Sequence, residues 1–390
     1  MSSGVNVIVD PDGDLVLLLD PTTPDLSKST DSSPRGTSAI ETPPKNTHKH
    51  TYKTLVQWES TLVYNSRILV SSKHMSLASP VFKAMLQGSF REGIELKTMG
   101  KLEVPLPDDH PAAMTILINI IHGRMNSVRL KIELELFTQM AILVDKYQCP
   151  EVVRPFSSIW KKELSATWSK RSNCTDIACW ICIAWQFELD DEFLKATQII
   201  QKQWTCSLKE RMEQLRYRLP VPKILIDKLE SSRLESIGKA VQILDATIAK
   251  YSLSSLNCTF NGSPTRSNDR NYDYGNHDSY GRRNPTASWD YSNIPSYRKD
   301  CDSMVLGSLI KSVTENGLYP LPKPPYTPWS LTSFISKVAL LEINTLCFKI
   351  TKAQTDQHDI KSQLNLAMNA IHVPSLTLAS CKELINKTRQ

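Results

Sequence analysis

Glycine is scarce in this chain, at 13 of 390 residues, and proline is commoner, at 23. This balance predicts ordered elements separated by irregular stretches. Long apolar runs are also missing, since the stretch from Ile177 to Phe187 is too short to span a bilayer. The first residues show no basic segment followed by an apolar core. We therefore expect a protein of the cytosol or nucleus, without a membrane partner.

The chain also lacks a strong excess of one charge. Its formal net charge is +6, and no block of Lys and Arg reaches the size of a nucleic-acid-binding tail. Nucleic acid is therefore not favoured as a partner. The nine cysteines are an odd number, scattered from Cys149 to Cys381. Without a secretion signal, this pattern predicts reduced thiols rather than a disulfide framework.

Motifs that carry enzyme chemistry are missing as well. There is no glycine-rich phosphate loop, no nucleophile elbow and no HExxH. Cys179-x-x-Cys182, with Cys174 nearby, alternates with large apolar residues and has no second ligand pair, which predicts buried structural thiols. Surface or packing roles are expected for the histidines of the N-terminal half, His48, His50, His74, His110 and His122. We predict no catalytic residue, no cofactor and no metal site.

The length exceeds that at which one hydrophobic core keeps growing, so two structured parts with linkers are expected. Stretches rich in polar residues and poor in large apolar ones predict disorder. The expected organisation is a first domain at 1–153 with a disordered insertion at about 22–51, a helical domain at 154–256, a low-complexity linker at 261–300 and C-terminal helical segments at 301–390.

Strands are predicted where short apolar runs lie between turn residues: Asp14–Leu19, Thr61–Val70 and Lys101–Leu106. After the second strand, one apolar helix face is predicted from Leu77, Ala78, Val81, Phe82 and Met85. Ser79-Pro80 interrupts this segment, which predicts two short helices or a kink.

Further helices follow from 3.6-residue periodicity. Asp108-Asp109 provides N-cap chemistry for a helix to Gly123, and Leu134 to Tyr147 forms another. From Val152 to Leu256 the pattern is helical almost throughout, with a helix or helix pair around Leu225–Leu244. Helices are also predicted at Ser303–Val313 and Leu331–Ile350.

The residues from Ile68 to Phe82 (ILVSSKHMSLASPVF) resemble the central signature of BTB/POZ domains, with Met75, Ser79 and Phe82 in its Leu, Ser and Phe places. Other motifs follow in the family's order. Phe90-Arg-Glu92 resembles its hydrophobic-x-Glu element, Ile121-His122-Gly123 its helix-ending turn, and the segment AILVDKY, with Asp145 and Tyr147, its A-x-x-A-D-K-Y helix.

The resemblance covers Gly13 to about Val153 with the insertion removed, and it places Asp14 among the signature residues. The wording is similar to BTB proteins of filamentous fungi. It implies an α+β BTB/POZ fold, a small sheet with a helical cluster, followed by a mostly α-helical region. Two departures bear on the homodimer surface: Ser71-Ser72 replaces the His-Lys of many animal members, and about forty residues separate the first two strands.

The function that the resemblance implies is a protein-interaction scaffold with protein partners, including a homodimer through the BTB domain. In a narrower version, the chain is a substrate adaptor of a cullin-type ubiquitin ligase, with Phe90 and Glu92 contacting the cullin. These two residues can equally close their helix and cap its loop, and the sequence leaves both readings open. The competing class is a nuclear regulator that binds nucleic acid or chromatin partners. An enzyme is a distant third.

Overall fold

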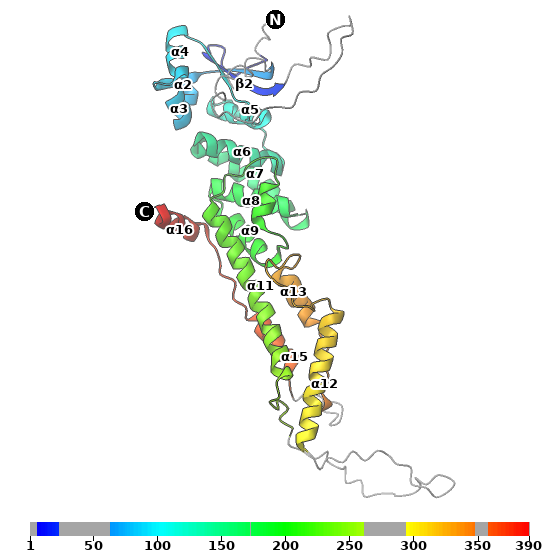
Figure 1. The fold of residues 1–390 in the computed structure, drawn as a ribbon. Coiled ribbons are helices and arrows are strands. Elements are labelled where there is room, and N and C mark those ends of the chain that lie inside the picture. Colours follow the sequence, from blue (N-terminus) through cyan, green and yellow to red (C-terminus); the bar gives the residue numbers. More distant parts are fainter. Residues whose placement is uncertain (1–5, 23–62, 172, 261–293, 348–357, 390) are drawn as a thin grey trace, which may run out of the picture. The chain divides into compact units, whose positions relative to one another are not determined.

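The computed structural model describes residues 6–22, 63–171, 173–260, 294–347 and 358–389. It is an α+β structure, mostly helical with a small four-stranded sheet (Figure 1), and it divides into two compact units, Met1–Glu192 and Phe193–Gln390. Apart from Thr22, the expected insertion lies outside the described residues. So does the expected linker up to residue 293. In the described parts of the chain, no helix combines the length and apolar character that a membrane crossing needs.

The sheet has the strand order β1-β3-β2-β4. Its strands are β1 (Val7–Ile8), β2 (Leu15–Thr22), β3 (Val63–Val70) and β4 (Leu102–Pro105). Strand β2 pairs antiparallel with β3 and parallel with β4, and β1 pairs parallel with β3. The three predicted strands are therefore confirmed. The two-residue strand β1 was not predicted.

The apolar run of β2 reflects its position inside the sheet. Leu15, Leu17 and Leu19 are fully buried on one face, and Val16 and Leu18 are buried on the other. A strand that is buried on both faces carries apolar residues at successive positions instead of alternating apolar and polar ones. Strand β4 lies at the edge and does alternate between buried and exposed residues.

Helices lie beside and below this sheet and continue the first unit (Figure 1): α2 (Ser72–Ala78), α3 (Pro80–Gln87), α4 (Arg91–Met99), α5 (Pro111–Ile121), the short η1 (Met125–Ser127), α6 (Leu134–Tyr147), α7 (Pro150–Arg171) and α8 (Cys174–Phe187). The predicted division at Ser79-Pro80 is confirmed. Leu77, however, is 89% exposed rather than part of the buried face. The N-cap of α5 is His110, whose side chain accepts from Ala113 N at 3.3 Å, and not Asp108-Asp109.

The first unit extends past the boundary that we expected at residue 153. Phe137 of α6 packs against Trp160 of α7 and against Trp180 and Phe187 of α8. These aromatic contacts give α6, α7 and α8 one shared core, so the compact unit ends at Glu192. Local periodicity identifies the helices but does not say which partner each apolar face will find.

The second unit is helical. Helix α9 (Asp190–Gln203) crosses the unit boundary, and the unit continues with α10 (Leu208–Glu213), α11 (Lys223–Ser252), α12 (Ile294–Glu315), α13 (Leu331–Ala339), α15 (Ile360–Asn369) and α16 (Leu378–Arg389). Helices α12, α13 and α15 pack against the long helix α11 (Figure 1). Their shared core includes Ile237, Leu244, Leu309, Phe334 and Leu364. The part of the predicted helical domain after residue 192 and the C-terminal helical segments predicted at 301–390 therefore lie in one unit.

Two helix boundaries here differ from the prediction. Helix α12 begins at Ile294, inside the expected linker, and the helix expected from Leu331 to Ile350 ends at Ala339. Beyond Ala339 the backbone bonds to α12 instead: Glu342 N donates to Ser312 Oγ at 2.8 Å, and Asn344 N donates to Ser308 Oγ at 2.9 Å. These tertiary bonds replace the next helical turn.

Candidate functional site

Three signature residues meet inside the first unit. Ser79 lies between α2 and α3, where its hydroxyl donates to Tyr147 O at 2.6 Å and accepts from Phe82 N at 3.1 Å. The Phe82 ring stacks on the Tyr147 ring at 4.5 Å. Met75 is fully buried on α2, and its carbonyl accepts from Ser79 N at 3.0 Å. This arrangement ties the α2–α3 corner to the end of α6, so these residues build the fold rather than a binding surface.

Replacing Ser79 with alanine should therefore destabilise the first unit. The change removes the N-cap of α3 and leaves Tyr147 O and Phe82 N buried without this partner. We expect a loss of about 2–3 kcal/mol. Urea unfolding followed by circular dichroism measures it, with Ser158→Ala on the exposed side of α7 as the matched control. A loss no larger than the control's would contradict this role for Ser79.

Tyr147 also anchors a polar group in the core. Its hydroxyl donates to Asp109, which is buried and pairs with Lys146 Nζ at 2.6 Å. Burial, followed by the Asp109 carboxylate, raises the pKa of Tyr147 above its usual range. Asp145 lies two residues earlier and is exposed at the surface, and partial burial of its carboxyl raises its pKa. The charged end of α6 is thus linked to the loop before α5.

The residue before β2 and the residue after α5 both accept hydrogen bonds from the start of α2. Asp14 accepts from both the backbone N and the hydroxyl of Ser72, each at 2.7 Å. His122 Nε2 accepts from Ser71 N at 3.1 Å, and its Nδ1 lies 2.9 Å from Ile118 O. Burial lowers the pKa of His122, in keeping with a neutral ring that donates from Nδ1 and accepts at Nε2.

Gly123 follows directly, with φ of +69°, in the left-handed region that glycine adopts without strain. It ends α5 at the turn where the signature expects a glycine. The histidine and the glycine therefore serve to terminate a helix and hold the neighbouring corner.

Phe90 and Glu92 differ from the other signature residues because they lie at the surface. Phe90 is the N-cap residue of α4 and is 58% exposed, while Glu92 is half-buried in the first turn. Ile94, four residues after Phe90 and therefore on the same helix side, is 57% exposed. Phe90 and Ile94 form an exposed apolar pair, hereafter the α4 pair.

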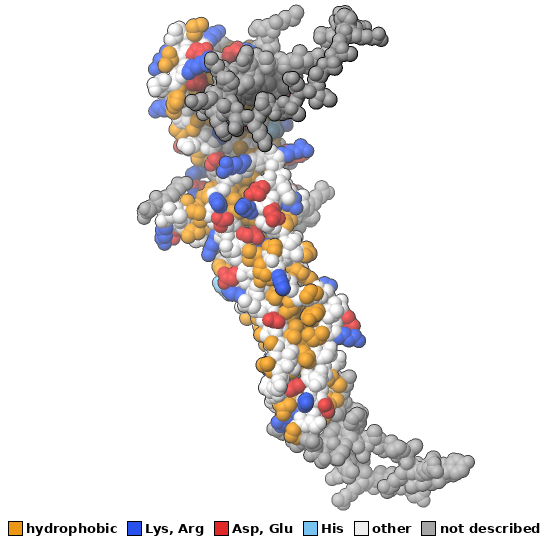
Figure 2. All heavy atoms as spheres, in the orientation of Figure 1, with side chains coloured by type: hydrophobic (Ala, Val, Ile, Leu, Met, Phe, Trp, Pro, Cys, Tyr) orange, Lys and Arg blue, Asp and Glu red, His pale blue; other side chains and the backbone are white. Residues whose placement is uncertain are grey.

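The position of this pair is fixed by a close backbone approach. Gly93 is buried, and a Cβ atom there would lie 2.8 Å from the Gly88 carbonyl oxygen. Only glycine allows α4 to lie this close to the end of α3. Apolar side chains occur among charged ones over α2, α3 and α4 (Figure 2). The close packing at Gly93 therefore fixes the position of the helix that carries the α4 pair.

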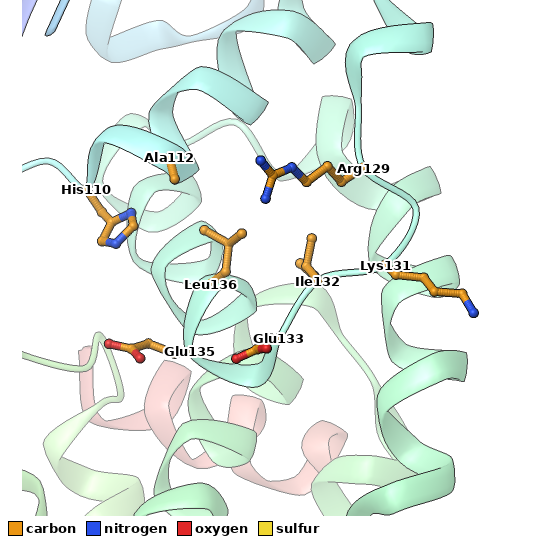
Figure 3. Close-up of a pocket in the computed structure, with 8 residues that line it drawn as sticks. All are labelled: His110, Ala112, Arg129, Lys131, Ile132, Glu133, Glu135 and Leu136. Carbon is orange, nitrogen blue, oxygen red and sulfur yellow. The ribbon is translucent and has the colours of Figure 1, made fainter.

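A pocket of about 530 Å³ opens between the starts of α5 and α6 (Figure 3). Its charged lining is mixed: Arg129 lies on one side of Ile132 and Leu136, Glu133 and Glu135 lie on the other, and Lys131 points away from this group. Lys131 is also paired with Glu163 at 3.3 Å, and Arg129 O accepts from the indole of Trp160 at 2.8 Å. No Ser, Thr or Cys side chain is among its lining residues.

The cysteines predicted to be structural are buried where α8 packs. Cys179 and Cys182 are both inside, and burial raises the pKa of the Cys182 thiol well above its usual value. Cys174 is half-buried at the start of the helix. The outcome for Cys179 and Cys182 is thus the one predicted. His48 and His50 lie outside the described residues.

A second group of thiols, in the other unit, was missed. Cys258, Cys301, Cys347 and His358 place their sulfur and ring nitrogen atoms within 4.8 Å of one another. The three cysteines are buried and His358 is partly exposed. Burial, followed by the neighbouring cysteines, raises the pKa of the Cys347 thiol above its usual range. The sequence carries no local signal for this group, because each residue comes from a separate segment.

The structure thus separates the signature residues, most of which hold the fold, from the α4 pair at the surface and from the Cys/His group of the second unit. No protein-family model matches the chain and no curated protein matches it, so the likeness to BTB/POZ domains rests on the motifs of the chain itself.

Proposed function

We propose that the chain is a protein-interaction scaffold whose first unit is a module of the BTB/POZ type and whose helical second unit engages further protein. The observation that carries the proposal is the α4 pair. Most of both side chains is in solvent, although Gly93 holds the helix that bears them in one position. Exposed apolar side chains on a rigid support are suited to the centre of a protein interface.

In its narrower form, the proposal makes the chain a substrate adaptor of a cullin-type ubiquitin ligase. Phe90 would enter an apolar pocket of the cullin, with Ile94 beside it. Glu92 lies in the first turn of α4, where a carboxylate favours the positive end of the helix dipole. In the adaptor reading the carboxylate would contact the cullin, and in the cap reading it would only orient the helix start.

Phe90→Ala with Ile94→Ala is expected to weaken binding of the full chain to its partner at least thirtyfold. The reason is that truncating one central apolar residue of an interface costs about 2 kcal/mol or more, which alone gives this factor. Stability should change by no more than about 0.5 kcal/mol, since both side chains are exposed. Affinity purification and mass spectrometry identify the partner, and binding to a purified cullin N-terminal domain measures the affinity.

Met99→Ala is the matched control, because Met99 is also apolar and exposed on α4 but lies at its far end. Retention of all partners by the double variant would contradict the proposal. Loss of a partner other than a cullin would keep the scaffold and remove the adaptor role. Glu92→Gln separates the two readings of that residue: a cap reading predicts a stability loss of about 0.3–1 kcal/mol with unchanged binding.

A further inference from the structure

Four potential metal ligands converge in the second unit from four separate segments. Cys258 follows α11, Cys301 lies on α12, Cys347 precedes the stretch 348–357, and His358 lies just before α15. Cys258 and Cys347 are 89 residues apart in sequence, and Cys301 and His358 are 57 apart. Bringing residues together across such long stretches of chain costs conformational entropy. An interaction among the four side chains would offset part of this cost.

The distances fit one tetrahedral ion. Cys347 Sγ lies 3.5 Å from Cys258 Sγ and 3.6 Å from Cys301 Sγ, and Cys301 Sγ lies 3.4 Å from His358 Nε2. With zinc–sulfur bonds of about 2.3 Å and zinc–nitrogen bonds of about 2.0–2.1 Å, a tetrahedron has edges of about 3.8 Å between sulfurs and about 3.6 Å from sulfur to nitrogen. These three separations are within a few tenths of an ångström of those values, and all four ligand atoms lie within 4.8 Å of one another.

The surroundings favour a site that is already formed. The residues beside Cys258 are tied to those beside Cys301: Asn257 N donates to Asp302 Oδ2 at 2.7 Å, and Arg298 Nε donates to Phe260 O at 2.9 Å. These bonds fix the first two thiols relative to each other without any contribution from the thiols themselves.

The outer layer of the group is apolar. Phe260, Tyr297 and Leu346 pack against the three thiols. His358 is the partly exposed member and leaves the group open to solvent on one side.

We propose that Cys258, Cys301, Cys347 and His358 bind one zinc ion in a closed, structural site. Three thiolates and one imidazole are a ligand set that selects zinc, and four protein ligands leave no position for a substrate or a catalytic water. The ion would join the end of α11, α12 and the start of α15. It would thereby fix the segments on both sides of residues 261–293 and 348–357.

Elemental analysis of the full chain, purified with a reductant, tests the site. We expect about one zinc per chain in the natural protein and at least a tenfold lower content in Cys301→Ala and His358→Ala. Two variants should keep the ion: His358→Cys, which restores four ligands as a Cys₄ site, and Cys381→Ala, which removes a buried cysteine of α16 outside the group.

Because a ligand variant can fail to fold, the natural protein provides a second measurement. Chelation should accelerate hydrogen exchange in α12 and at residues 253–260, and added zinc should restore protection. Cobalt should give the absorption of a tetrahedral, thiolate-bound ion. A reduced protein that takes up neither metal would overturn the proposal, as would equal zinc loss in Cys381→Ala. Iron in place of zinc would overturn the choice of metal.

Discussion

Replacing Phe137 with alanine is expected to lower the free energy of unfolding of the first unit by about 3–5 kcal/mol. Phe137 is fully buried on α6. Its ring stacks on Phe187 at 5.3 Å and meets Trp160 and Trp180 edge-on at 5.6 and 6.4 Å. The change opens a cavity where α6, α7 and α8 meet. Each lost aromatic pair adds about 0.5–1.5 kcal/mol to the loss of buried area.

Urea unfolding gives the size of this loss, and hydrogen exchange shows where it is felt. If the aromatic contacts make α7 and α8 part of the first unit, exchange in both helices should accelerate together with exchange in α6. Leu77→Ala is the control, because that side chain is 89% exposed and its loss should change stability by no more than about 0.5 kcal/mol. Unchanged protection of α8 would mean that the unit ends earlier.

Features that depend on a few neighbouring residues were predictable from the sequence. The run DLVLLL identifies a buried strand because β2 lies between two other strands and is covered on both faces. Ser79-Pro80 ends one helix and starts the next. The serine caps α3, and the proline has no backbone N–H, which would have no acceptor at the first position of a helix. Phe90 and Glu92 were singled out by resemblance, and the structure places Phe90 at the surface.

Features that depend on distant partners were not predictable. The helix after Leu331 stops at Ala339 because serines of α12 accept the next free amides, and these serines are 30 and 36 residues away. The Cys/His group follows no C-x-x-C spacing, since its four residues are brought together only by the packing of α11, α12 and α15. The boundary of the first unit was missed for the same reason, because Phe137 of α6 packs against residues of α7 and α8 that lie far from it in the sequence.

This contrast also bears on function. Asp14, Ser79, His122 and Tyr147 are engaged in bonds within the fold, so their variants report on stability rather than on partner choice. The α4 pair is exposed, and its variants are expected to leave the unit folded. The interaction surface and the zinc site are therefore separable by experiment, because they lie in different units.

An ion pair of the second unit gives the other large effect: Glu230→Ala is expected to cost about 3–5 kcal/mol, because it leaves the buried Arg233 charge without its partner. Arg233→Met is expected to be clearly less destabilising, because Glu230 is partly exposed and still accepts from Leu208 N. Arg233 is fully buried on α11 and donates to Glu230 Oε1 at 2.9 Å and to Pro325 O at 3.2 Å. Among the described residues, its Nε and Nη1 have no hydrogen-bond partner. The guanidinium therefore does not recover its full desolvation cost.

The asymmetry between the two variants is the informative result. Removing Glu230 leaves a buried positive charge and also deprives Leu208 N of its acceptor, which lies 3.0 Å away. Glu230→Gln keeps an acceptor for Leu208 and isolates the loss of charge, so its effect should fall between the other two. Methionine at 233 fills similar space without a charge, and Pro325 lies at the surface, where water can satisfy its carbonyl.

Urea unfolding of the three variants measures the order of their stabilities. If Arg233→Met were as destabilising as Glu230→Ala, ordered water would have to satisfy the remaining donors, and the pair would be a net source of stability.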